Sequence, residues 1–293
     1  MAVEILRRRI KTTQDLRDIV GNMKMLSSVS ILQYEQADKA LDKYLRNLRN
    51  AFHILALNGG LPQINNKQNI QPRYLFLLIG SDNGMVGGFN RDIVDEAKNY
   101  LRQKHIPMSS VRFVTVGKRV SAMAENAGLK ILNSYAVSNS VKAVSMLAEN
   151  VILNIDTAIR KERISEVWIV SHHRGEHNQI SIERKKIIPF DVKRLQKLQY
   201  KKWETNNIPM LGVEASQMFA ELVNEALMIS VAKEINASLA SEHYTRMTNM
   251  QNAEKNIDEN LEELNLEYQQ QRQEDITDEL IDVISGAEAM KDK

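Results

Sequence analysis

Several residue types that often stabilise or equip a protein are scarce in this sequence. The 293 residues include no cysteine, which excludes a disulfide framework, a cysteine-ligated zinc and a cysteine nucleophile. Aromatic residues make up only 5%, which is little for a compact enzyme core and favours long helical parts. The formal net charge of +2 is too small to indicate a nucleic-acid partner. No run approaches the roughly 18 consecutive apolar residues of a membrane helix, so we expect no direct membrane insertion.

Proline and glycine are scarce too, and they are unevenly placed. All five prolines and all but two of the 12 glycines lie between residues 59 and 212. A proline costs a helix interior about 3 kcal/mol and a glycine about 1 kcal/mol. Residues 1–58 and 210–288 are therefore two arms that contain almost nothing to interrupt a helix.

Both arms carry apolar residues in steps of three or four, the spacing of a coiled-coil seam. In the first arm these residues are Leu6, Ile10, Leu16, Ile19, Met23 and Leu26, with Thr13 filling one position, then Tyr34, Ala37, Leu41, Tyr44, Leu48 and Leu55. In the second arm they are Met247, Met250, Ile257, Leu261, Leu264 and Tyr268, then Ile276, Leu280 and Ile284.

The charges of the two arms are complementary. Residues 1–58 hold ten Lys/Arg and six Asp/Glu, whereas residues 250–293 hold four Lys/Arg and thirteen Asp/Glu. Opposite charges on two helices favour side-by-side packing and help to fix its direction. We expect a long antiparallel coiled coil; two helices folded back on a bundle are the alternative.

The middle of the chain alternates strand and helix patterns. Strands are expected at residues 73–80, 111–116, 131–136, 166–171 and 178–188, and helices at 91–104, 117–127 and 140–160. Strands separated by helical segments indicate crossover connections and a parallel sheet. The pattern predicts one Rossmann-like α/β domain over 73–190, preceded by a linker at 58–72. We expect its last strand to pair antiparallel with its predecessor through a loop at 172–177.

A glycine-rich loop, SDNGMVGGFN, follows the first predicted strand. Helix starts attract anions, but neither the Gly-Lys-Ser/Thr ending of a Walker loop nor the G-x-G-x-x-G fingerprint is present. Nucleotide binding is thus the minor alternative, and we expect a structural turn in which glycines permit positive φ and close helix–sheet contact. The residues assigned to this structural loop are Ser81, Asp82, Gly84, Gly87, Gly88 and Asn90.

Other candidate sites are weak. The residues His172, His173 and His177 are expected in one solvated turn, where Glu176 adds no recognisable zinc geometry. A basic cluster of Arg184, Lys185, Lys186, Lys193, Arg194 and Lys197 is expected to be a solvated face rather than a phosphate-binding one. No nucleophile–base spacing stands out, so we predict no catalytic residue, no metal and no cofactor.

Three segments resemble one family in its order and spacing. The segment RRRIKTTQDLRDIVGNMKMLSS resembles the opening helix of the gamma subunit of F-type rotary ATP synthases. SDNGMVGGFN resembles that family's S-D-x-G-x-x-G-G-x-N motif, and SEHYTRMTNMQNAEKN with RQEDITDELIDVISGAEAM resembles its carboxyl-terminal signature and tail. The sequence Ala253-Glu254-Lys255-Asn256 departs from the family's Ala-Thr-Asp-Asn, which leaves open a divergent or alternate branch, including a sodium-coupled one.

The resemblance implies a non-catalytic subunit. In that family the paired terminal helices form the central shaft inside a hexamer of alternating alpha and beta subunits, and ion flow turns a membrane ring together with the shaft. The implied partners are the alpha, beta and epsilon subunits and the membrane rotor ring. The implied location is peripheral, on the cytoplasmic face of the cell membrane.

The resemblance also implies partner-binding residues. Met23, Lys24 and Arg246 match family positions near the contact between shaft and beta subunit, and Arg272 with Gln273 matches residues that engage a beta-subunit loop. From periodicity alone, Arg272 and Gln273 would equally suit the solvated face of a long helix. Two rival functions remain: a stand-alone α/β nucleotide- or phosphate-binding module with a dimerising coiled-coil stalk, and a structural tether without ligand.

Overall fold

The computed structural model describes residues 2–62, 72–137, 140–203, 205, 207 and 209–291, with side chains up to residue 285. The chain forms two compact units. Unit 1 comprises Met1–Ser28 and Arg246–Lys293, and unit 2 comprises Val29–Thr245. The helices α1 (Ala2–Leu57) and α6 (Ala215–Lys291) each contribute residues to both units. No helix within the described residues combines the length and the apolar character needed to cross a membrane.

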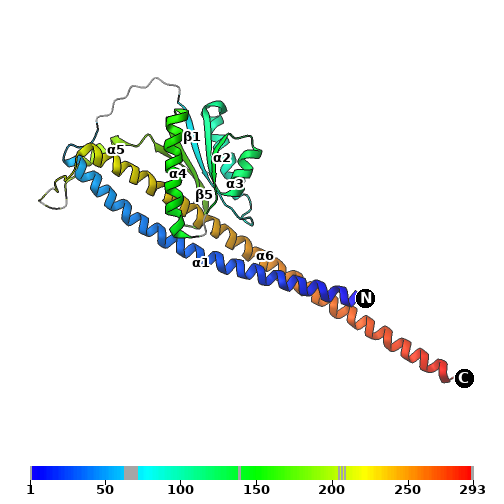
Figure 1. Ribbon diagram of the computed structural model, residues 1–293. Coiled ribbons are helices and arrows are strands. Elements are labelled where there is room, and N and C mark those ends of the chain that lie inside the picture. Colours follow the sequence, from blue (N-terminus) through cyan, green and yellow to red (C-terminus); the bar gives the residue numbers. More distant parts are fainter. Residues whose placement is uncertain are drawn as a thin grey trace. The chain divides into compact units, whose positions relative to one another are not determined.

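Unit 1 is an antiparallel pair made by the first half of α1 and the last part of α6 (Figure 1). Arg17 pairs with Asp258 and Lys24 pairs with Glu254, so rising residue numbers in α1 meet falling numbers in α6. Both pairs join a basic residue of α1 to an acidic residue of α6. The predicted long antiparallel helices and their charge complementarity are therefore present.

The contact seam of α1 differs from the predicted one. Leu16, Ile19 and Leu26 are 49%, 54% and 67% exposed, so these three do not belong to it. The covered positions of this part of α1 are Val3, Leu6, Ile10, Thr13, Val20, Gly21, Met23, Lys24 and Ser27. Two successive steps of three, from Thr13 through Leu16 to Ile19, rotate off a face that repeats every 3.5 residues on average. The observed seam includes the polar residues Lys24 and Ser27, which the predicted seam lacks.

The predicted seam of α6 holds only in its first part. Met250 and Leu264 are buried, whereas all residues from 276 to 285 are exposed. Because Arg17 meets Asp258 in an antiparallel pair, the first residues of α1 lie opposite the region of Gln273. Among the described residues, no α1 residue lies beside the apolar residues of α6 beyond that point.

Unit 2 contains a five-stranded sheet in the order β3-β2-β1-β4-β5. The strands are β1 (Tyr74–Ile79), β2 (Val111–Val116), β3 (Ile131–Tyr135), β4 (Glu166–Arg174) and β5 (Ile180–Ile188). The first four are mutually parallel, and β5 is antiparallel to β4. The Rossmann-like α/β architecture and the antiparallel last strand agree with the prediction.

Helices cover both faces of this sheet. One core joins Phe76 and Leu78 of β1 to α2 (Phe89–Gln103) and α3 (Lys118–Asn126). The other joins Leu75, Leu77 and Ile79 to α4 (Val141–Glu162) and to the part of α6 around Ile235. Alternate residues of β1 point to opposite faces, and both faces are buried, which explains its continuous apolar run. The short elements η1 (Met108–Ser110), α5 (Val192–Gln196) and η2 (Lys197–Tyr200) complete the fold.

One strand boundary was predicted wrongly. β4 continues to Arg174, and its residues His172 and His173 pair with Ile182 and Ser181 of β5. These histidines therefore lie in the sheet and not in a solvated turn, and His172 is buried. Polar residues suggested a loop, but α6 covers this end of the sheet and donates a hydrogen bond from Ser241 to the His172 carbonyl. Residues 63–71 of the expected linker lie outside the described residues.

Candidate functional sites

The loop Ser81–Asn90 connects the end of β1 to the start of α2 through a buried hydrogen-bond network. The Ser81 amide donates to Asn90 Oδ1 at 2.8 Å, and Asn90 Nδ2 donates to Ser81 Oγ at 2.8 Å. The Ser81 hydroxyl donates in turn to the Asn83 carbonyl at 2.8 Å. Both Ser81 and Asn90 are buried, so the asparagine side chain closes the loop on itself.

Asp82 ties the same loop to two neighbouring crossovers. One carboxylate oxygen accepts from the Lys118 amide at 2.7 Å, and the other accepts from the Val137 amide at 3.1 Å. These amides lie at the start of α3 and shortly after β3. Both oxygens of Asp82 thus satisfy backbone donors at the carboxyl edge of the sheet.

Gly80, which precedes this loop, and the glycines within the loop meet different requirements. A Cβ on Gly80 would lie 2.4 Å from Asn90 Oδ1 and 2.5 Å from Val120 Cβ. Gly87 has a φ of 58°, whereas Gly88 has a φ of −77° and precedes α2 as its N-cap. A Cβ on Gly88 would lie 2.9 Å from the Asp92 carboxylate. Positive φ is therefore needed at Gly87, and close approach is needed at Gly80. At Gly88 the close atoms are the ends of flexible side chains, which can move aside.

An ionic network joins β4 and β5 to α6 and centres on the buried Glu234. Glu234 Oε2 accepts from Ser171 Oγ at 2.8 Å and pairs with His173 Nε2 at 2.7 Å. Its Oε1 accepts from Lys185 Nζ at 2.8 Å. No sequence pattern pointed to this site, although Glu234 stands next to Ile235 in the buried stripe of α6, where a carboxylate needs a partner.

The network shifts the pKa values of its members. Burial alone would raise the pKa of Glu234, but the bonds from His173 and Lys185 lower this pKa to about 2. Burial alone would lower the pKa of His173, but the hydrogen bond and charge of Glu234 outweigh it and raise this pKa. The two side chains are therefore held as an ion pair between strand and helix.

The neighbouring His172 is held neutral. Its ring stacks on Phe89 with 3.8 Å between ring centres. Burial, with a smaller contribution from His173, lowers its pKa to about 4. Its Nδ1 is buried without a hydrogen-bond partner in the structure. Throughout the described residues, no cluster of three His, Cys, Asp or Glu side chains could hold a metal ion.

Three members of the predicted basic cluster are engaged by carboxylates. Arg184 Nε lies 3.3 Å from Glu96, and its guanidinium sits over the Tyr100 ring. Lys186 Nζ lies 2.9 Å from Glu166, and Lys185 belongs to the Glu234 network. These pairings compete with any phosphate for the three cations.

The predicted partner-binding residues all belong to unit 1 but form two groups. Met23 and Lys24 are half-buried in α1, and Arg246 is buried in α6. Lys24 pairs with Glu254, one of the residues at which the sequence departs from the family pattern. Arg272 and Gln273 are exposed and lie roughly 40 Å further along α6 from Arg246, at 1.5 Å per residue.

Comparisons with known proteins point to one family. A family model described as ATP synthase matches residues 2–290. The ATP synthase gamma chain of Geobacter metallireducens is 27% identical over 296 residues, covering 99% of both chains. That of Clostridium kluyveri is 27% identical over 286 residues, covering 98% of this chain and 97% of the relative.

Solved structures show the same fold. A chain in the cryo-EM structure of the Euglena gracilis mitochondrial ATP synthase (OSCP/F1/c-ring, rotational state 3) superposes with a TM-score of 0.67 at 18% identity, covering 99% of this chain and 94% of the other. A chain from the central stalk and c-ring of the Tetrahymena thermophila enzyme gives 0.54 at 20% identity, covering 80% and 99%. With its family model matched from residue 2 to residue 290, this chain belongs to the ATP synthase family, and its full-length relatives are gamma chains.

Proposed function

We propose that this chain is the gamma subunit of an F-type ATP synthase. In this role it is the central rotor shaft that couples ion-driven rotation of a membrane ring to conformational changes in the catalytic alpha–beta hexamer. The observation that carries the proposal is the likeness to ATP synthase gamma chains over the full length of both sequences. The antiparallel pair of α1 and α6 supports it, since two long helices side by side suit a shaft.

The proposed subunit acts by contact rather than by chemistry. A shaft changes the populations of the catalytic states only through contacts that differ between those states. We assign such contacts with the beta subunits to Met23, Lys24, Arg246, Arg272 and Gln273. Catalysis then belongs to the hexamer, and the subunit is a non-catalytic part of the complex.

The loop Ser81–Asn90 is proposed to be a scaffold of the α/β fold. Its side chains and several nearby amides already satisfy one another: Ser81 with Asn90, and Asp82 with Lys118 and Val137. A phosphate-binding loop needs free amides that point at the ligand. These internal hydrogen bonds favour a scaffold over the rival nucleotide- or phosphate-binding module.

The proposed location follows from the proposed partners. Attachment to the membrane ring and the epsilon subunit would make the chain a peripheral membrane protein on the cytoplasmic face of the cell membrane. The membrane-spanning parts would belong to its partners.

Copurification tests the proposal. The full chain carrying an affinity tag is expressed together with the alpha, beta and epsilon subunits of the same organism. If the chain is a gamma subunit, we expect it to recover three alpha and three beta subunits for each tagged chain. The recovered complex is expected to hydrolyse ATP. Recovery of the tagged chain alone, as a monomer or dimer, would favour a stand-alone module or a tether.

A further inference from the structure

A cleft in unit 2 lies between α4 and α6, and none of its lining residues belongs to the loop Ser81–Asn90. Its volume is about 360 Å³, within the range of small-molecule sites. The floor is apolar and continuous with the sheet core, because Ile152 and Ile155 of α4, Ile188 of β5 and Leu227 and Met228 of α6 form it. Such a floor favours an occupant with an apolar body.

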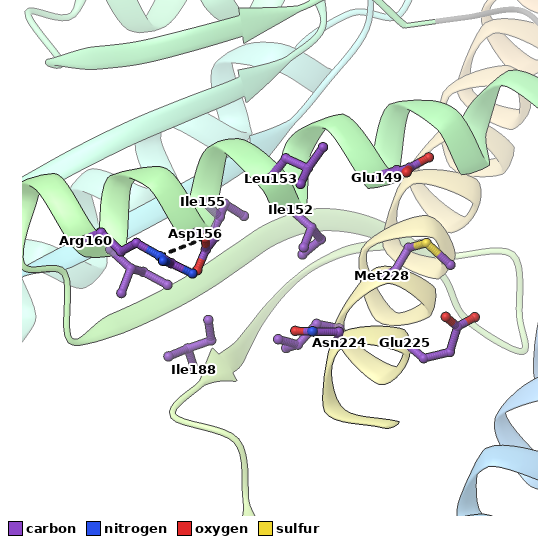
Figure 2. A pocket seen from close by; sticks show the side chains of 12 residues that line it. Glu149, Ile152, Leu153, Ile155, Asp156, Arg160, Ile188, Asn224, Glu225 and Met228 are labelled. Carbon is purple, nitrogen blue, oxygen red and sulfur yellow. Dashed lines mark ion pairs between the residues drawn. The ribbon is translucent and has the colours of Figure 1, made fainter. Parts of the chain in front are cut away.

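Carboxylates dominate the rim (Figure 2). At one end Asp156 and Arg160 form an ion pair, with Nε and Oδ2 3.0 Å apart, and neutralise each other. Toward Met228 stand Glu149 of α4 and Glu225 of α6. The rim is therefore polarised, with uncompensated negative charge at a single end.

Neither glutamate at this end is paired with a cation in the part of the chain that the structure describes. Within the described residues, Glu149 makes no ion pair or side-chain hydrogen bond. Glu225 accepts a hydrogen bond from Tyr44 Oη at 2.8 Å, but a neutral phenol leaves the carboxylate charge in place. A cation bound against the apolar floor is attracted to both carboxylates, and most strongly to the half-buried Glu225, because the effective dielectric constant falls with burial.

We propose that this cleft binds a lipophilic organic cation, a flat ring system that carries one ammonium group. The ring lies on the isoleucines and Met228, whose thioether suits an aromatic face. The ammonium lies at the end of the rim that carries Glu149 and Glu225. An anion of the same shape is rejected, because its charge would face both carboxylates.

A matched pair of fluorescent probes tests this site on the full chain. Dansylcadaverine carries an ammonium, and dansyl-6-aminohexanoic acid carries a carboxylate on a linker of the same length. We expect saturable, one-to-one binding of the cation, with blue-shifted emission, and at least about tenfold weaker binding of the anion. Equal affinity for both probes, or no saturation by the cation, would overturn the proposal.

Charge reversal at the rim locates the binding. Glu149 is exposed and unpaired among the described residues, so Glu149→Lys is expected to leave the fold intact. We expect this variant to bind the cationic probe about tenfold more weakly than the wild type and the anionic probe more tightly. Glu125→Lys on α3, at an exposed position outside the cleft, is the control and should change neither affinity. If both variants lowered the affinity for the cationic probe equally, the effect would come from net charge, and the cleft would not be the binding site.

Discussion

Gly80 occupies a position where even one added carbon has no room. A Cβ there would stand 2.4 Å from Asn90 Oδ1 and 2.5 Å from Val120 Cβ, and both neighbours are buried. We expect Gly80→Ala to lower the free energy of unfolding by about 2 kcal/mol, since inserting carbons into a packed core costs 1–3 kcal/mol. Urea unfolding of the full chain measures this difference.

Gly212→Ala is the matched control, because a Cβ at Gly212 meets nothing within 4 Å. The control is expected to leave stability within about 0.5 kcal/mol of the wild type. Equal stability of both variants would show that the loop is not the close-packed scaffold described above.

His172 makes stability depend on pH. Its pKa is lowered to about 4 in the folded chain, against about 6.5 when unfolded. The unfolded state therefore binds more protons between these values, and the contribution of His172 falls as pH drops from 6.5 to 4. The loss reaches roughly 3 kcal/mol at 1.36 kcal/mol per pKa unit.

His172→Phe keeps the ring stack on Phe89 and removes the titration. Unfolding free energies of wild type and variant are compared at pH 7 and pH 5. The variant is expected to lose less stability than the wild type on acidification. Parallel losses would mean that His172 is protonated in the folded state as readily as in the unfolded one.

At the scale of elements, the seam of α1 can be tested by neighbouring substitutions. Val20 is half-buried on the observed seam, whereas Ile19 is 54% exposed. Val20→Asn is expected to destabilise unit 1 by about 1–2 kcal/mol, and Ile19→Asn by less than about 0.5 kcal/mol. Hydrogen exchange of amides in residues 2–28 reports this local stability. A larger loss of stability from Ile19→Asn than from Val20→Asn would favour the seam predicted from apolar spacing alone.

The sequence predicted elements better than their contacts. Periodicity and glycine placement located the strands of unit 2 and both long helices, because these patterns depend on local geometry. The α1 seam was misplaced because Lys24 and Ser27, which the structure covers, are polar. The end of β4 was missed because burial of His172 depends on α6, which is distant in sequence. The pairing of Glu234 with its partners could not be predicted either, because it forms only when α6 packs against β4 and β5.

At the scale of the whole molecule, Arg272 and Gln273 test the proposed coupling. Both are exposed, so Arg272→Ala with Gln273→Ala is expected to leave the chain folded and the complex assembled. Loss of a charge-assisted hydrogen bond made in only one rotational state, worth about 1.5–3 kcal/mol, should slow turnover roughly tenfold or more.

Rates of ATP hydrolysis and synthesis on purified complex check this expectation, with subunit stoichiometry as the control for assembly. The pair Gln269→Ala with Gln270→Ala, also exposed on α6, is the matched variant and should retain wild-type rates. If the Arg272 and Gln273 variant kept wild-type rates of both hydrolysis and synthesis, these two side chains would not take part in coupling and would only face solvent.

Rotation itself is the most direct test of the proposed shaft. Because the chain has no cysteine, Lys130→Cys at an exposed position offers a single attachment site for a bead. The alpha–beta hexamer is fixed to a surface, ATP is added, and the bead is followed by microscopy. A rotor shaft predicts stepwise rotation in one direction, with one dwell for each catalytic beta subunit, that stops when ATP is removed. A stationary bead on a complex that hydrolyses ATP at its full rate would contradict the proposal.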